Sequence, residues 1–164
     1  MSDPASLLVF EYVPARLQRT SLKLYALRLM QEVAGGRDFT CLLTNDEKLR
    51  ELNRTWRGKD EPTDVLSFPA SHLPGALKQA MPAPPLGELA ISCGRARFQA
   101  AENGHTLEEE IAILMLHGVL HLMGMDHESD KGQMRRAELR WRRRLGLPNG
   151  LIERAGRGRK RRVA

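Results

Sequence analysis

Three of the five histidines of this chain, His117, His121 and His127, fall within eleven residues. On an α-helix, positions i and i+4 differ by only about 40° around the axis and about 6 Å along it, so two imidazoles can reach one ion. Gly124 can adopt the left-handed conformation that ends a helix, and the chain would then bring His127 to the same place. The spacing therefore predicts that the three histidines bind one divalent transition metal ion, with zinc as the first choice.

A site of this kind is expected to catalyse a reaction and not only to stabilise the fold. Three protein ligands leave the fourth tetrahedral position of zinc open for water, which is typical of catalytic zinc sites. The histidines and the glycine match the metzincin protease pattern H-E-x-x-H-x-x-G-x-x-H, but Gly118 stands in the place of the catalytic glutamate. Cleavage of a peptide bond needs a base and an acid, whereas a metal ion can itself activate water and polarise a phosphoryl oxygen. The pattern therefore favours hydrolysis of a phosphodiester over proteolysis.

Two further blocks accompany the histidine segment, at 52–69 (LNRTWRGKDEPTDVLSFP) and 86–92 (LGELAIS). Together with 117–127, these 36 residues resemble the YbeY family of bacterial rRNA maturation endoribonucleases. The resemblance implies a metal-dependent endoribonuclease that prefers single strands, with a metalloprotease-like arrangement of the sheet and the zinc-site helix. It further implies a cytoplasmic role in 16S rRNA 3′ end maturation, ribosome assembly and rRNA quality control, with RNA and ribosomal particles or ribosomal proteins as partners.

The resemblance also implies roles for single residues. His117, His121 and His127 would bind zinc, one ion per chain, and Arg57 would lie near the metal and contribute to activity. Met125 stands where the family commonly has tyrosine, so this chain lacks a phenol beside the expected metal site. None of the three ligands is affected by that difference.

Arg57 is the candidate catalytic residue, and Arg57 and Lys59 are the candidate RNA-binding residues. The guanidinium fork of arginine pairs with two phosphoryl oxygens at once, so Arg57 could stabilise the charge that grows during attack by water or by the RNA 2′-hydroxyl. From the residue type alone a surface salt bridge is the simpler role, and the family resemblance reverses that preference. Asp64 and Asp126 are expected to cap, turn or orient ligands.

The other two histidines and both tryptophans are expected to take no part in the reaction. His72 falls in a segment rich in Pro, Ala and Gly, and His105 precedes a helix cap, so both are expected to face solvent. Trp56 and Trp141 could stack on bases, but packing in the core is the expected role for both.

Basic residues are concentrated toward the C-terminal end. Residues 131–164 hold 13 Lys and Arg against two acids, Glu138 and Glu153, so this part is net +11 and residues 1–130 are net −5. A basic segment on a mildly acidic body favours a polyanionic partner, although a solvated helix face is the plain alternative. Together with the resemblance, this favours RNA and not DNA as the partner.

Nothing in the sequence predicts a membrane partner. No run approaches the about 18 consecutive apolar residues of a membrane-spanning helix, and the N-terminus lacks the basic and apolar regions of a signal peptide. We therefore expect a cytoplasmic protein, with Cys41 and Cys93 as buried free thiols.

The 164 residues fit one domain, for which the pattern predicts an α+β fold. Apolar runs bounded by turn signals predict strands at 7–13, 39–43, 64–68 and 86–92. Helical spacing and capping residues predict helices at 22–33, from a cap at 44–46 toward 56, from Ser92 to 102, from the capping box of Thr106 and Glu109 to 123, and after a cap at 129–130. We expect one mixed four-stranded sheet flanked by helices over 1–149, a surface loop at 70–85, and a basic, disordered tail at 150–164.

Two alternatives to the ribonuclease stay open. The missing glutamate also fits a non-catalytic, metal-stabilised ribosome assembly factor, which would bind rRNA or ribosomal proteins without cutting RNA. A minimal metallopeptidase would need a carboxylate from elsewhere in the chain, such as Glu88. Loss of cleavage with retained binding on replacement of Arg57 would argue against the assembly factor. Hydrolysis of casein or a peptide that survives RNase inhibitors would favour the metallopeptidase.

Overall fold

The computed structural model describes residues 7–70, 80 and 84–148. Its strands form one sheet in the order β1-β2-β4-β3, in which β3 is antiparallel to β4 and the other neighbours are parallel. The predicted mixed four-stranded sheet is therefore confirmed, whereas most of the expected loop at 70–85 and the expected tail at 150–164 lie outside the described residues. The strands are β1 (Leu8–Phe10), β2 (Phe39–Thr44), β3 (Val65–Pro69) and β4 (Gly87–Ser92).

The first strand is shorter than the apolar run at 7–13 predicts. β1 ends at Phe10, although apolar residues continue to Val13. Tyr12 takes a left-handed backbone conformation with φ of 57°, and a strand needs an extended conformation at every residue. The backbone at Tyr12 therefore turns the chain out of the sheet.

The helices follow the predicted order, and three of the predicted caps are confirmed. The side chains of Asn45 and Ser92 cap the second and third of them, and Thr106 with Glu109 forms the predicted capping box of the next. None of the helices in the described part of the chain has the length and apolar character needed to cross a membrane. The helices are α1 (Arg19–Arg28), continued by the π-helical turn η2 (Leu29–Val33), α2 (Asp46–Arg57), α4 (Cys93–Asn103), α5 (Leu107–Leu122) and α6 (Gln133–Leu145).

The last helix begins later than the predicted cap at 129–130. The Asp130 carboxylate accepts hydrogen bonds from the backbone N–H groups of Gly132 at 2.8 Å and Met134 at 2.9 Å. Gly132 has a φ of 92° and turns the chain into α6, which starts at Gln133. The Asp130 carboxylate therefore accepts from backbone N–H groups at the start of α6, although Asp130 lies before the turn at Gly132. A capping pattern in the sequence does not reveal that turn.

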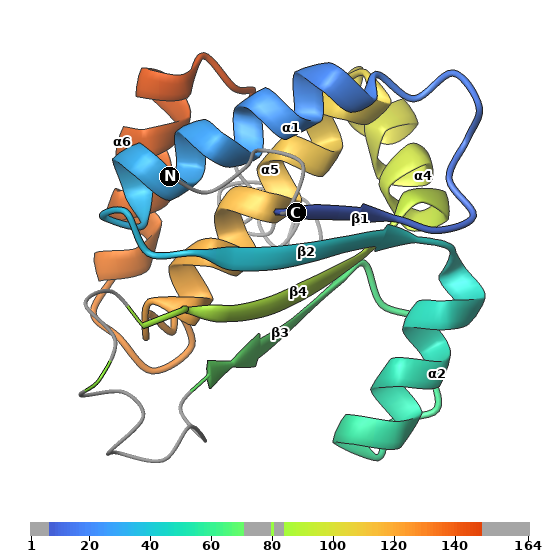
Figure 1. Cartoon of the computed structure of the whole chain (residues 1–164), viewed down its shortest axis with the longest axis horizontal. Coiled ribbons are helices and arrows are strands. Elements are labelled where there is room, and N and C mark those ends of the chain that lie inside the picture. The colour runs from blue at the N-terminus through green and yellow to red at the C-terminus, as the bar shows by residue number, and fades with distance from the viewer. Residues whose placement is uncertain (1–6, 71–79, 81–83, 149–164) are drawn as a thin grey trace, which may run out of the picture.

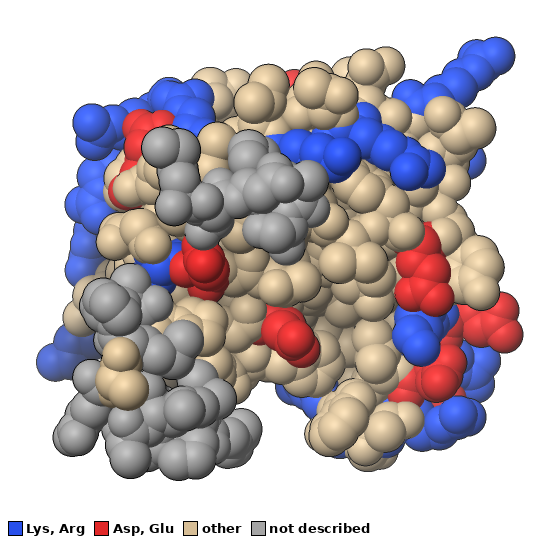
Figure 2. Space-filling view, viewed as in Figure 1, with Lys and Arg blue, Asp and Glu red and all other residues tan. Residues whose placement is uncertain are grey.

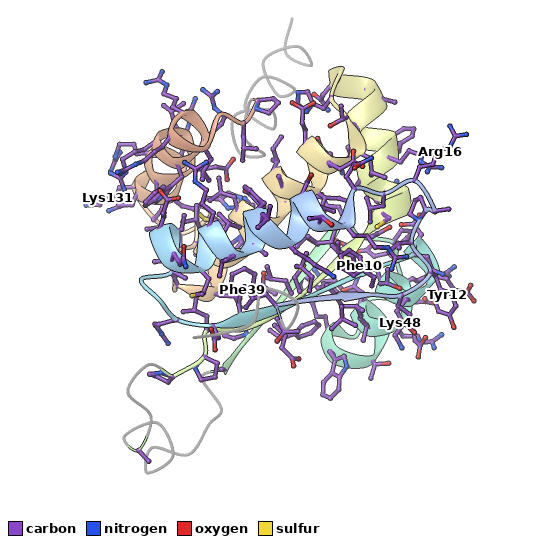
Figure 3. All side chains as sticks on the ribbon, turned by 45° about the horizontal axis from the view of Figure 1, so that its top comes forward. Phe10, Tyr12, Arg16, Phe39, Lys48 and Lys131 are labelled. Carbon is purple, nitrogen blue, oxygen red and sulfur yellow. The ribbon has the colours of Figure 1, made fainter. Side chains whose placement is uncertain are left out.

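Helices cover the two faces of the sheet unequally (Figure 1). α1 and α5 lie on one face, and α2 lies on the other side, beside the strands. Side chains of β2 alternate accordingly: Phe39, Cys41 and Leu43 are buried under the helices, where Figure 3 shows Phe39 between the sheet and α1. Thr40 and Leu42 point to the opposite face and stay partly exposed, so this face of the sheet remains open to solvent.

Both cysteines are buried free thiols, as the sequence predicts. Burial raises the pKa of the Cys93 thiol to about 11 and raises that of Cys41 as well. Both thiols therefore stay protonated near neutral pH and offer no thiolate to a metal ion.

α5 is buried along almost its whole length and lies close against the sheet. Every residue from Glu110 to Leu120 is buried. At Gly118 the helix approaches β4 so closely that a Cβ atom would lie 2.7 Å from Cδ2 of Leu89. The helix that carries two of the candidate metal ligands is therefore held in place by the core of the protein.

We predict that Gly118→Ala destabilises the fold relative to Gly94→Ala. Both glycines lie in helices, where alanine is favoured over glycine by up to about 1 kcal/mol. A Cβ at Gly94 would have no neighbour closer than 3.8 Å, whereas a Cβ at Gly118 would overpack Leu89, at a cost of about 1–3 kcal/mol. Urea unfolding of the two variants in the same metal state should show this difference. Equal stabilisation by both substitutions would contradict the close packing of α5 on β4.

Candidate metal centre

The three predicted ligands come together at the C-terminal end of α5. One nitrogen from each of His117, His121 and His127 can be chosen so that all three lie within 4.8 Å of one another. The ring centroids are 4.7 to 5.7 Å apart. His117 is buried, His121 is half-buried and His127 is exposed, so the cluster runs from the core to the surface. Three imidazoles in this arrangement could hold one divalent transition metal ion and leave its solvent side open.

The turn after α5 brings His127 to the other two histidines. Gly124 has a φ of 95°, its N–H donates to the carbonyl of His121 at 2.9 Å, and the N–H of Met125 donates to the carbonyl of Leu120 at 3.2 Å. This pair of bonds is the Schellman arrangement that closes a helix with a left-handed glycine. The role that the sequence predicts for Gly124 is therefore confirmed.

A buried carboxylate from α6 orients the first histidine. Oε2 of Glu138 lies 2.9 Å from Nδ1 of His117, and both side chains are almost fully buried. A carboxylate can only accept a hydrogen bond, so Nδ1 carries the hydrogen and Nε2 keeps its lone pair for a metal ion. The sequence analysis missed this residue. Its one signal is that Glu138 follows Ala137 on the buried face of a helix whose other charges are arginines.

The second histidine is in a form that suits metal binding. Partial burial lowers the pKa of His121, the nearby His117 lowers it further, and a hydrogen bond with the backbone of Met125 partly offsets the change. The neutral imidazole is the species that binds a metal ion. The lowered pKa therefore leaves the His121 lone pair available near neutral pH.

A polar pocket of about 770 Å³ surrounds the histidines. Arg57 lines it and, within the residues that the structure describes, forms no ion pair, so a structural salt bridge does not account for this side chain. Lys59 is exposed and does not line the pocket. The sequence analysis also missed Ser67 of β3 and Glu128, which both line it.

Two carboxylates at the pocket have the structural roles that the sequence predicts. Asp64 accepts hydrogen bonds from the N–H of Val65 at 2.7 Å and from Nε2 of Gln99 at 3.1 Å. Asp126 accepts from the N–H of Glu128 at 3.1 Å and from Oγ of Ser129 at 3.0 Å, and the first of these bonds is the main reason that its pKa is lowered. Both carboxylates therefore hold the chain around the pocket.

The structure corrects two expectations and leaves a third untested. His105 does not face solvent, because its Nδ1 lies 3.2 Å from Oε2 of the buried Glu110 and only 11% of its side chain is exposed. Trp56 does not pack in the core, because 69% of it is exposed where α2 extends past the sheet. Trp141 does pack against the core as expected. His72 lies outside the described residues.

The glutamate of the metzincin pattern would have no place in this site. Gly118 faces Leu89 in the sheet, so a side chain at this position would point away from the open pocket. Glu88, one carboxylate that a metallopeptidase could use, lines a different cavity on the other face of the sheet. Asp64, Asp126 and Glu128 line the pocket, but none of them lies on the helix, where the protease pattern has its glutamate, and the first two hold the surrounding chain through hydrogen bonds.

We predict that Glu138→Gln weakens metal binding by about 10- to 100-fold, because removal of the carboxylate leaves the tautomer and orientation of His117 less well defined. Metal affinity is measured by competition with a chromophoric chelator. Glu110→Gln is the matched control, since Glu110 is also buried and also pairs with a histidine, His105, that is not a candidate ligand. Equal affinities in the two variants would show that Glu138 does not orient the ligand.

Comparisons with known proteins agree with this geometry. The family model of endoribonuclease YbeY matches residues 13–146. A relative named endoribonuclease YbeY from Solibacter usitatus is 55% identical and covers 94% of this chain and 98% of its own, and one from Koribacter versatilis is 44% identical and covers 85% and 86%. A solution structure of a Thermotoga maritima protein shares the fold with a TM-score of 0.54 at 24% identity, over 82% of this chain and 85% of that one. This chain belongs to the endoribonuclease YbeY family.

Proposed function

We propose that this protein is a zinc-dependent endoribonuclease that cuts single-stranded RNA. The observation that carries the proposal is the convergence of three imidazoles in one open polar pocket of a chain from this family. The arginine that lines the same pocket has no ion-pair partner among the described residues. His117, His121 and His127 are the proposed zinc ligands, with one ion per chain. The proposed setting is the cytoplasm, in 16S rRNA 3′ end maturation, ribosome assembly and rRNA quality control.

The side chains around the pocket have different roles in the proposed reaction. A zinc ion bound by the three histidines would lower the pKa of water and polarise a phosphoryl oxygen. Arg57 binds the non-bridging phosphoryl oxygens and stabilises the negative charge that grows on them during attack. Glu138 fixes the tautomer of His117, and the hydrogen bonds of Asp126 hold the turn that carries His127.

An arginine-rich face of α6 supports a large RNA partner such as a ribosomal precursor particle. Figure 2 shows Lys and Arg gathered along the left edge of the molecule, over α6. Guanidinium groups without an ion-pair partner in the described part of the chain are open to phosphates, whose counterions they would release. We propose that residues 1–149 form the endoribonuclease domain and that the basic tail at 150–164 is an accessory to it. The α6 arginines around this surface are Arg136, Arg140, Arg143 and Arg144.

We predict that His121→Ala and chelation each abolish both metal binding and RNA cleavage, because two imidazoles do not retain zinc as tightly as three. Zinc content and cleavage of a 16S rRNA precursor fragment are measured on the same full-length preparations, with zinc added back after chelation. His105→Ala is the control, since His105 pairs with Glu110 and is not part of the cluster. Zinc-loaded wild type that cuts no faster than His121→Ala would contradict the nuclease and favour a ribosome assembly factor.

We predict that Arg57→Ala lowers the maximal cleavage rate by about 10²- to 10³-fold and changes RNA binding much less, because the charge that Arg57 stabilises exists mainly in the transition state. Arg57→Lys should recover only part of the rate, since an ammonium group lacks the two-pronged fork. Lys59→Ala should weaken binding and its salt dependence but not the maximal rate, as expected for an exposed phosphate contact. An unchanged rate in Arg57→Ala would remove Arg57 from the mechanism.

A further inference from the structure

A second cavity, here called the sheet cavity, lies on the face of the sheet that α1 and α5 do not cover. Its volume is about 750 Å³, which is within the range of about 300–1,000 Å³ of small-molecule sites. It is lined by residues of α2 and of all four strands. Most of its lining is apolar. The apolar residues include Val9, Leu42, Leu52, Trp56, Phe68 and Ala90.

The sheet cavity continues from the metal pocket around the edge of the sheet. β3 is one of the two edge strands of the sheet, and its side chains alternate between the two faces. Val65 lines the metal pocket and Phe68 lines the sheet cavity, while Ser67, Pro69 and Arg57 line both. A strand of RNA with a phosphate at Arg57 can therefore pass over the edge strand and place the next group in the sheet cavity.

The lining of the sheet cavity suits a nucleobase and not a phosphate. Trp56 is 69% exposed, although most of the surface of a tryptophan is normally buried in a folded protein. Glu88 contributes a carboxylate that has no ion-pair partner among the described residues. The cation of the lining, Arg57, is shared with the metal pocket, so the part of the cavity that is not shared is apolar except for Thr40 and Glu88. A base has apolar faces for stacking and polar edges for hydrogen bonds, and it fits that part better than a phosphate does.

We propose that the sheet cavity binds one unpaired nucleobase, guanine by preference, from the RNA strand whose phosphodiester lies at the metal centre. The base stacks on Trp56, and Glu88 accepts hydrogen bonds from its edge. Guanine is the base that offers two adjacent donors, N1–H and the amino group, to the two oxygens of one carboxylate. Adenine, cytosine and uracil each place an acceptor beside a donor on the same edge, so a carboxylate binds them less well.

The proposal rests on the proposed RNA substrate and gives a physical reason for a single-strand preference. A base in the sheet cavity is stacked on protein and hydrogen-bonded along its pairing edge, so it cannot be paired in a duplex at the same time. Duplex RNA would have to unpair and unstack that base first, which weakens its binding. The preference would then arise beside the metal pocket and not at the metal ion.

The test compares the binding of short fluorescein-labelled oligouridines that carry one central guanine, adenine or cytosine. Fluorescence anisotropy is measured on the full chain with chelator present, so that nothing is cut, and cleavage is measured after zinc is restored. Trp56→Ala should weaken binding of the guanine oligonucleotide by about 5- to 100-fold, and Trp56→Phe should weaken it less. Glu88→Gln should remove a guanine preference of about tenfold. The controls are Phe98→Ala, an aromatic residue of α4 that is also exposed, and Glu51→Gln, an exposed acid of α2 outside the cavity.

Each outcome separates the base site from the proposed nuclease. Trp56→Ala that binds and cleaves like Phe98→Ala overturns the base site while the nuclease stands, and the cavity would then fit a protein segment or a second copy of this chain. Equal weakening of single-stranded and duplex RNA by Trp56→Ala also overturns it. Selective weakening of single strands, with no cleavage by zinc-loaded wild type, supports the base site and overturns the nuclease. Thermal melting of Trp56→Ala and Trp56→Phe shows whether both retain the fold.

Discussion

The candidate metal centre depends on how closely α5 packs against β4. Gly118 allows the helix axis to approach Leu89, and His117 is the residue directly before it. Successive residues on a helix point about 100° apart, so a helix that is pressed onto the sheet at Gly118 turns His117, and His121 one turn later, to the side of the helix that lines the pocket. A Cβ at this position would require either the Leu89 side chain to shift or the helix to move together with both histidines.

The burial of His117 requires a hydrogen-bond partner for its side chain, and α6 supplies that partner. His117 is buried to 6% exposure, and an imidazole in that position requires a hydrogen-bond partner for its second nitrogen. Glu138 supplies it from α6, where it is buried like Met134 and Ala137 of the same helix. A bound divalent cation would also compensate the charge of the buried carboxylate, which connects the fold of the last helix to the metal centre.

The parts of this protein that are local in sequence could be predicted, and the parts that depend on contacts between distant segments could not. The histidine spacing, the left-handed Gly124 and the helix caps are each contained within a few residues. Glu138 is 21 residues from His117 and is hidden in a run of arginines. Trp56 follows the spacing of a core-facing residue, but the sheet face beside it is left uncovered. Only the three-dimensional arrangement distinguishes these cases.

The position of Gly118 also changes what the absent glutamate means. In the sequence, its absence argues equally for a nuclease and for a protein that catalyses nothing. In the fold, position 118 faces Leu89 and could not serve the pocket, so the glycine reflects the packing of the helix and gives no support to a non-catalytic role. For the proposed reaction the main demand is the negative charge on the phosphoryl oxygens, and a metal ion with Arg57 can meet that demand without a carboxylate on the helix. The same histidine spacing therefore suits two chemistries. A neighbouring carboxylate that moves protons suits cleavage of a peptide bond, and a guanidinium that stabilises charge on phosphoryl oxygens suits cleavage of a phosphodiester.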